Sequence, residues 1–153
     1  MRSDLPSFKI SVADWVRDNQ TLKEIRSVVF IREQSVPVEL EWDGLDDSAL
    51  HLIATATDNI SVASARLLPD GHIGRVAVLK AWRHQGIGTA LMQEIIHQAE
   101  LLGYKKLELE AQIQAIPFYE KLGFVSYGDE FMDAGIRHKN MRRDMSPSAP
   151  PIK

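Results

Sequence analysis

A glycine-containing loop at residues 83–91 (RHQGIGTAL) carries the clearest chemical signal in the chain. It follows a strand-like segment at 74–79 and precedes a long amphipathic helix pattern. Gly86 and Gly88 have no Cβ, so a ligand can approach the backbone closely there. The first N–H groups of the following helix have no intrahelical acceptor and attract an anion. The loop therefore predicts a phosphate site built largely of backbone, although it matches neither a P-loop nor a dinucleotide fingerprint.

A second candidate for chemistry is Tyr119, which lies in the segment 115–124 (AIPFYEKLGF). The pattern predicts a short helix over 115–122 that ends at Gly123. A phenol within hydrogen-bond distance of a reacting group can donate a proton to that group. Taken alone, Tyr119 would be interpreted as a core residue of an amphipathic helix.

The two segments, in this order and at this separation, resemble the GCN5-related N-acetyltransferase (GNAT) family over roughly residues 50–145. The resemblance implies an α/β (α+β) fold, with a mixed, mostly antiparallel central sheet flanked by helices. It implies transfer of an acetyl group from acetyl-CoA to a primary amine by direct attack on the thioester, with Tyr119 protonating or stabilising the departing thiolate. The alternatives are a non-catalytic acyl-CoA-binding sensor, an acyltransferase for a longer acyl-CoA, and a protein-interaction module.

The same resemblance implies where acetyl-CoA binds. In the family, the strand before the loop bulges away from its neighbour, and its free backbone groups pair with the pantetheine arm. The expected cofactor-binding residues are Val76, Ala77 and Val78 along this arm, and Arg83, His84, Gln85, Gly86, Ile87, Gly88 and Thr89 around the pyrophosphate. No metal is expected, because no His/Asp cluster has convincing metal-ligand spacing.

Glu33 is one candidate for the general base that an incoming ammonium needs. It lies four residues after Val29 and eight after Ile25, so it continues their apolar helical stripe and is expected to point inward. Burial would raise the pKa of Glu33 and let it accept a proton. The alternative is a structural ion pair with Arg66 or Arg75.

His138 is the second candidate for the base. It belongs to a set of segments that resemble the ElaA-like branch of the family, namely 29–34 (VFIREQ), 74–78 (GRVAV), Ala111-Gln112 and 134–141 (AGIRHKNM). The resemblance implies that Glu33, Gln112 and His138 lie on the acceptor side, although His138 could equally be a structural histidine. Some relatives place a base at the position of His72, which we interpret here as a surface residue at the end of a turn.

The rest of the pattern predicts the elements that position these groups. Strands are predicted over 8–12, 51–57, 61–68, 73–79, 106–111, 124–131 and 137–143, and helices over 21–34, 87–102 and 115–122. Turns are expected at Asp58-Asn59 and at 69–71 (PDG), which makes the strands from 51 to 79 an antiparallel meander. One domain over 1–145 follows, with a Pro/Ser-rich, disordered tail over 146–153.

An acidic stretch at 39–47 separates the first helix from the meander. We expect it to be a solvated surface loop, whose carboxylates could also attract a cationic acceptor. Trp42, amid these charges, could stack on an acceptor or on a partner.

Composition limits the class of protein. The chain has 153 residues and a formal net charge of −3, which gives no basic field for nucleic acid. It has no cysteine, which excludes disulfides and thiolate chemistry. No apolar run is long enough to span a bilayer, and the first residues lack a signal-peptide pattern. We expect a cytoplasmic protein that binds a small-molecule or peptide amine acceptor. Neither a nucleic acid nor a membrane is expected as a partner, and a homodimer is possible.

Overall fold

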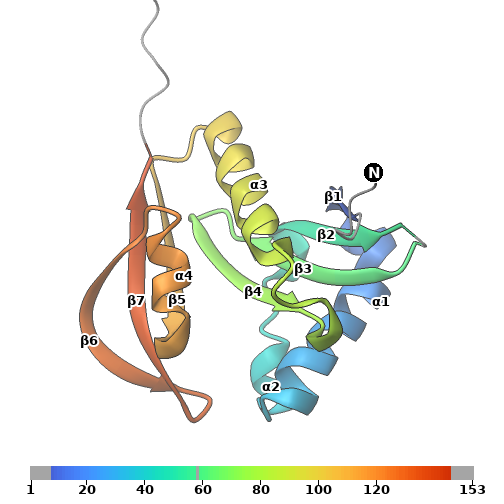
Figure 1. Ribbon diagram of the computed structural model, residues 1–153, viewed down its shortest axis with the longest axis horizontal. Coiled ribbons are helices and arrows are strands. Elements are labelled where there is room, and N and C mark those ends of the chain that lie inside the picture. The colour runs from blue at the N-terminus through green and yellow to red at the C-terminus, as the bar shows by residue number, and fades with distance from the viewer. Residues whose placement is uncertain (1–7, 58, 146–153) are drawn as a thin grey trace, which may run out of the picture.

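The protein is built around a seven-stranded sheet with the strand order β1-β2-β3-β4-β5-β7-β6 (Figure 1). The computed structural model describes residues 8–57 and 59–145, so Asp58 and the predicted tail at 146–153 lie outside the described residues. The strands are β1 (Phe8–Ala13), β2 (Leu50–Ala56), β3 (Ser61–Leu67), β4 (His72–Val78), β5 (Lys106–Gln112), β6 (Val125–Asp133) and β7 (Ile136–Asp144). The helices are α1 (Trp15–Arg26), the π-helix η1 (Ser27–Glu33), α2 (Val38–Glu41), α3 (Ile87–Leu102) and α4 (Ile116–Glu120), with 3-10 turns η2 (Asp46–Ser48), η3 (Lys80–Trp82) and η4 (Ile113–Ala115). This mixed, mostly antiparallel architecture confirms the predicted fold class.

The sheet consists of two antiparallel parts that meet at β4 and β5. Strands β1 to β4 form a meander, and β5, β7 and β6 form the second part. β4 and β5 run parallel and pair only through His72 with Glu108 and Ile73 with Leu109. Beyond these two pairs the strands diverge toward their carboxyl ends (Figure 1). The glycine loop and α4 follow these two ends in the chain, so the topology brings both predicted motifs to one place.

A β-bulge bends β4 just past this junction. The register with β3 shifts between Ser64 and Arg66, so that Arg75 and Val76 together oppose Ala65. Arg75 has a φ of +52°, in the left-handed region that non-glycine residues rarely adopt. The bulge increases the local bend of β4, which agrees with the distortion that the family resemblance implies for this strand.

Helices cover both faces of the sheet. Val76 and Val78 pack into the main core with α3, whereas Ala77 packs against α1 and η1. Successive residues of a strand point to opposite faces, so α1 and η1 lie on one face and α3 on the other. α4 packs into the main core through Phe118 and Tyr119 and therefore shares the α3 face. In the described part of the chain, no helix is long and apolar enough to cross a membrane.

The first helix differs from its prediction at both ends. Asp14 caps α1 by accepting a hydrogen bond from the Val16 N–H at 2.9 Å, so the helix begins at Trp15 rather than at Thr21. After α1 the chain continues as the π-helix η1, whose wider turns change the directions of the later side chains. The direction of Glu33 therefore cannot be extrapolated from the α-helical stripe that precedes it.

Candidate functional site

The glycine loop leaves the start of α3 open. Gly86, the residue before the helix, has a φ of +86°, and no side chain caps the helix there. The N–H groups of Ile87, Gly88 and Thr89 therefore have no intrahelical acceptor. A Cβ placed on Gly86 would meet nothing within 4 Å, whereas one placed on Gly88 would lie 3.6 Å from Phe118. The backbone at this helix start is accessible, and its dipoles favour a negatively charged group.

The side chains of the loop contribute less to this opening than its backbone. Ile87 is buried in the main core, so only its N–H can face a ligand. His84 and Gln85 are exposed, and Gln85 donates a hydrogen bond to the Ala81 carbonyl at 3.4 Å. His84 has a φ of +65°, which turns the chain toward the helix start.

Arg83 and Glu33 form a two-point ion pair beside the loop. Two guanidinium nitrogens of Arg83 each lie 2.6 Å from a Glu33 oxygen, and its Nε donates to the Val78 carbonyl at 2.8 Å. The hydrogen bonds from Arg83 lower the pKa of Glu33 below its ordinary value. The Glu33 side chain is 37% exposed. The predicted buried Glu33 with a raised pKa is therefore wrong, and its partner is Arg83 rather than Arg66 or Arg75, because η1 turns it off the apolar stripe.

This ion pair also changes the expected roles of two cofactor-binding residues. Arg83 is engaged within the protein at all three guanidinium nitrogens, so its charge is already balanced by Glu33. The Val78 carbonyl already accepts a hydrogen bond, which leaves it less available to a pantetheine arm. Val76, at the bulge, is the part of the predicted 76–78 segment that lines the cleft beside β4.

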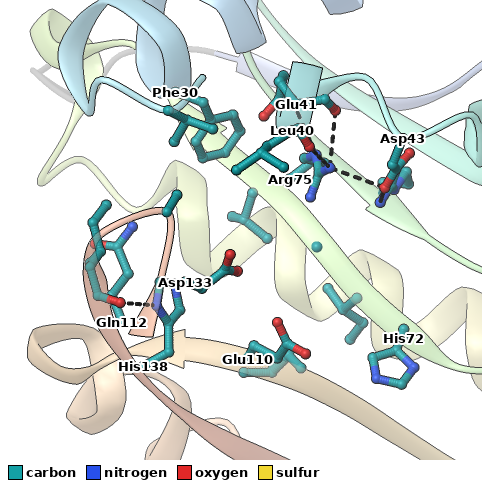
Figure 2. Close-up of a pocket in the computed structure, with 18 of the residues that line it drawn as sticks. Phe30, Leu40, Glu41, Asp43, His72, Arg75, Glu110, Gln112, Asp133 and His138 are labelled. Carbon is teal, nitrogen blue, oxygen red and sulfur yellow. Dashed lines mark hydrogen bonds and ion pairs between the residues drawn. The ribbon is translucent and has the colours of Figure 1, made fainter. Parts of the chain in front are cut away.

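A cleft of about 460 Å³ lies where β4 and β5 diverge (Figure 2). It is lined from four sides, by the end of η1, the α2 segment, β4, and the part of the sheet that contains β5 and the β6–β7 turn. Four predicted site residues line it together, namely Val76, Gln112, Tyr119 and His138. Glu33 is not among its lining residues. The volume is that of a small-molecule site.

Tyr119 reaches the cleft from α4. Its ring packs edge-on against Phe118 and Phe124, with centroid distances of 4.9 and 6.1 Å, which fixes its orientation. Burial raises the pKa of Tyr119 to about 12, so the hydroxyl stays protonated at neutral pH. Within residues 8–57 and 59–145, no hydrogen bond engages this hydroxyl, which leaves it able to donate to a ligand.

His138 lines the cleft from β7, and its side chain is buried, with 8% of the residue exposed. Its Nδ1 lies 2.8 Å from the Ile136 carbonyl, and since a carbonyl only accepts, Nδ1 donates this hydrogen bond. The ring stacks on Phe131 with a centroid distance of 5.9 Å. These contacts fix both the orientation and the tautomer, so Nε2 of the neutral ring is a proton acceptor.

Gln112 connects β5 to the end of η1. Its Nε2 donates to the Gln34 side-chain oxygen at 3.0 Å, and its own oxygen accepts from Gln114 at 2.6 Å. Gln112 is paired with His138 across β5 and β7, so the two side chains share one face of the sheet. His72 lies farther along the cleft, 41% exposed and 3.3 Å from Asp70, which agrees with a surface histidine at the end of a turn.

A buried charge network holds the acidic stretch against the sheet. It consists of Arg26, Arg66, Arg75, Glu41, Asp43 and Asp46. Arg26 donates to Glu41 and to Asp46, each at 2.8 Å. Arg75 lies 3.1 Å from Glu41 and 3.0 Å from Asp43. Three guanidinium groups thus balance three carboxylates, which explains how so many charges are buried.

The prediction that this stretch is a solvated loop is therefore wrong. Glu41 and Asp46 are buried, and α2 and η2 occupy parts of the stretch. Burial would raise the pKa of Asp43, but hydrogen bonds from Arg66 and from the Leu45 N–H lower it to about 2. Trp42 lies 5.0 Å from the Arg26 guanidinium and so packs on the network. This arrangement could not be predicted from the sequence, because the three arginines lie on three different elements that only the fold brings together.

Two carboxylates of the cleft lie outside this network. Glu110 of β5 and Asp133 of β6 both project into the cleft with His138 (Figure 2). No salt bridge joins either one to another residue in the described part of the chain. The sequence signal for Glu110 is its position two residues before Gln112, on the same face of a strand. Asp133 has no such signal, since only the β6–β7 turn brings it to the cleft.

Comparison with known proteins identifies the family to which the chain belongs. A family model described as an acetyltransferase (GNAT) domain matches residues 19–145. The chain is 35% identical over 134 residues to the uncharacterized N-acetyltransferase YjcF of Bacillus subtilis. The aligned region covers 84% of this chain and 96% of YjcF. It is 30% identical over 132 residues to the protein ElaA of Escherichia coli, and the aligned region covers 81% of this chain and 86% of ElaA.

Solved structures share the fold. The structure of an acyl-CoA N-acyltransferase from Pseudomonas aeruginosa is 32% identical, with a TM-score of 0.80, over 90% of this chain and 99% of that one. Escherichia coli ElaA has a TM-score of 0.80 at 27% identity, over 90% of this chain and all of that one. Both the predicted family resemblance and its ElaA-like pattern are confirmed.

Proposed function

Because the chain belongs to the GNAT acetyltransferase family, we propose that it transfers an acetyl group from acetyl-CoA to a primary amine. The observation that carries the proposal is the divergence of β4 from β5 beside the uncapped start of α3, with Tyr119 and His138 lining the cleft between them. Acetyl-CoA is the co-substrate in this proposal, and no metal takes part.

The described residues fit a molecule with a pyrophosphate and an extended amide arm. The N–H groups of Ile87, Gly88 and Thr89 would meet the pyrophosphate, and the open space at Gly86 permits a close approach. Past Ile73, β4 has no pairing with β5, so its backbone at the bulge is available to the amide groups of the arm. Arg83, balanced by Glu33, would hold the loop rather than supply the main positive charge.

Acetyl transfer needs a proton acceptor and a group that stabilises the leaving thiolate. The amine nitrogen attacks the thioester carbonyl carbon and passes a proton to Nε2 of His138, and the C–S bond then breaks. The thiolate accepts a hydrogen bond from the Tyr119 hydroxyl. An ordinary thiol ionises near pH 8.5, well below the pKa of about 12 for Tyr119, so hydrogen bonding to the thiolate is a better match than complete proton transfer.

His138 is the stronger of the two candidates for the base. It lines the same cleft as Tyr119, and its Nε2 is left as the acceptor by the hydrogen bond to Ile136. Glu33 lies outside this lining, and its pKa is lowered by Arg83, which makes it a poorer base at neutral pH.

The direct test measures thiol released from acetyl-CoA in the presence of a panel of primary amines. The chain has no cysteine, so a thiol reagent gives no signal from the protein itself. The amine dependence separates a transferase from a sensor, and an acyl-CoA series measures chain-length preference. Acetyl-CoA that binds without any amine-dependent release, across the whole panel, would contradict the proposal.

A matched pair of glycine variants tests where the cofactor binds. Gly86 and Gly103 flank the two ends of α3, have φ values of +86° and +82°, and have no atom within 4 Å of an added Cβ. Gly86→Val and Gly103→Val therefore carry a similar backbone strain. We expect calorimetric titration to show loss of acetyl-CoA binding only in Gly86→Val. Equal affinity in the two folded variants would move the pyrophosphate site elsewhere.

A further inference from the structure

The charges that line the cleft do not balance. Arg66 and Arg75 are paired with Glu41 and Asp43, and they belong to the network in which three guanidinium groups face three carboxylates. Two lining carboxylates, those of Glu110 and Asp133, remain after this pairing. With its histidines neutral, the lining therefore carries an excess of two negative charges, both on exposed side chains. Two like charges at one cleft attract a cationic ligand.

The position of His138 shows that these carboxylates face the reacting end of the cleft. His138 is buried, with 8% of the residue exposed, and its Nε2 has no partner in the described part of the chain. Glu110 is paired with Asn140 on β5 and β7, one diagonal step from the Gln112–His138 pair, which places its backbone about 7 Å from that of His138. Asp133 is paired with Ile136, whose carbonyl holds the His138 ring.

We propose that the acceptor is a small aliphatic amine that carries a second positively charged group. This inference rests on the proposed acetyl transfer and names its substrate class. One amine is positioned at His138 for attack, and the other remains protonated and is held by Glu110 and Asp133. The reaction itself is unchanged: the amine nitrogen forms the amide bond as the C–S bond breaks, its proton passes to Nε2 of His138, and CoA leaves as the thiolate. The second ammonium group keeps its proton. The volume of about 460 Å³ suits a short, flexible cation of this kind.

The test compares three acceptors with four-carbon chains, whose distal group is positively charged, neutral or negatively charged. These are 1,4-diaminobutane, 4-amino-1-butanol and 4-aminobutyrate. Hydrogen bonds to charged groups are each worth enough to change a rate constant by about tenfold to a hundredfold. We expect kcat/KM to be higher by this factor for the diamine than for the amino alcohol, and lowest for the amino acid. The preference should decrease with added salt, since the two carboxylates are exposed to solvent.

Glu110→Gln and Asp133→Asn should each reduce the ratio of kcat/KM between the diamine and the amino alcohol. Glu130→Gln is the matched control, because Glu130 also lies on β6 but pairs with Arg137 and does not line the cleft. It should leave the ratio unchanged. If amines support thiol release but the three acceptors react equally, the inference fails while the proposed function stands. If no acceptor supports thiol release, the proposed function fails first.

Discussion

Replacing Arg26 with methionine would test the buried network that holds α2 and η2 against the sheet. Arg26 is 1% exposed and donates to Glu41, to Asp46 and to the Glu41 carbonyl. Methionine keeps the unbranched apolar stem of the side chain but removes the guanidinium group and its charge. The network would then hold three carboxylates and two guanidinium groups, with one buried negative charge left unbalanced.

The structure sets the expected size of this effect. Removing one partner of a buried ion pair costs about 3–5 kcal/mol. Glu41 would keep Arg75 at 3.1 Å, and Asp46 would keep Arg66 at 3.1 Å, so neither carboxylate loses every partner. We therefore expect the lower end of this range, about 3 kcal/mol. For a domain of this size, that loss lowers the Tm by roughly 6–12 °C.

Thermal unfolding followed by circular dichroism would measure this change. Arg17→Met is the control, because Arg17 pairs with Asp18 but is 68% exposed, and we expect its Tm to match that of the wild type. Combining Arg26→Met with Asp46→Asn should cost less than the sum of the two single changes, since the pair removes opposite charges together. A Tm for Arg26→Met within about 2 °C of the wild type would show that the network contributes little to stability.

Three further predictions concern single side chains. Tyr119→Phe should lower turnover by about 10²–10³-fold with unchanged acetyl-CoA affinity, as for the loss of one donor to a developing anion; near wild-type turnover would remove this hydroxyl from the mechanism. His138→Asn should lower the rate chiefly at low pH and recover at high pH, where free amine is abundant, whereas Glu33→Gln should keep the wild-type pH–rate profile; the opposite pattern would make Glu33 the base. Asp43 has a folded pKa of about 2, below its ordinary 3.8, so its stabilising effect is present above pH 4 and is lost as the pH falls toward 2. The urea midpoints of Asp43→Asn and the wild type should therefore differ at pH 7 and approach each other between pH 4 and pH 2, and a constant difference would contradict this linkage.

Local patterns in the sequence were sufficient for most of the sheet and for the glycine loop. The strand around Leu109 alternates apolar and charged residues, the strand around Ile73 follows a turn, and Gly86 stands directly before an amphipathic helix. Each of these signals depends on neighbours within a few residues, so it can be recognised in the sequence. The order of the signals along the chain then predicts the family and the fold. The catalytic interpretation of Tyr119 came from the family resemblance, because its local pattern alone indicates a core residue.

The errors arose where distant residues determine the local structure. Glu33 left the predicted stripe because η1 is a π-helix, a rare form that no periodicity in this segment signals. Glu41 and Asp46 were predicted to be solvated, but they are buried because arginines from α1, β3 and β4 meet them in space. Asp133 reaches the cleft only through the pairing of β6 with β7. For Glu41, Asp46 and Asp133 the deciding contact joins separate elements, whereas for Glu33 it is the rare form of the helix itself.

The junction of β4 with β5 also has a mechanical consequence. β5 and β7 are joined along seven residue pairs, from Lys106 with Asp144 to Gln112 with His138, whereas β4 and β5 share two. A force or a thermal fluctuation that separates neighbouring strands therefore breaks fewer hydrogen bonds between β4 and β5 than between β5 and β7. Local opening of a protein follows such lines of weak connection, and amide hydrogen exchange reports them. The cleft thus lies along the line where the two parts of the sheet can move relative to each other at the lowest cost in broken hydrogen bonds.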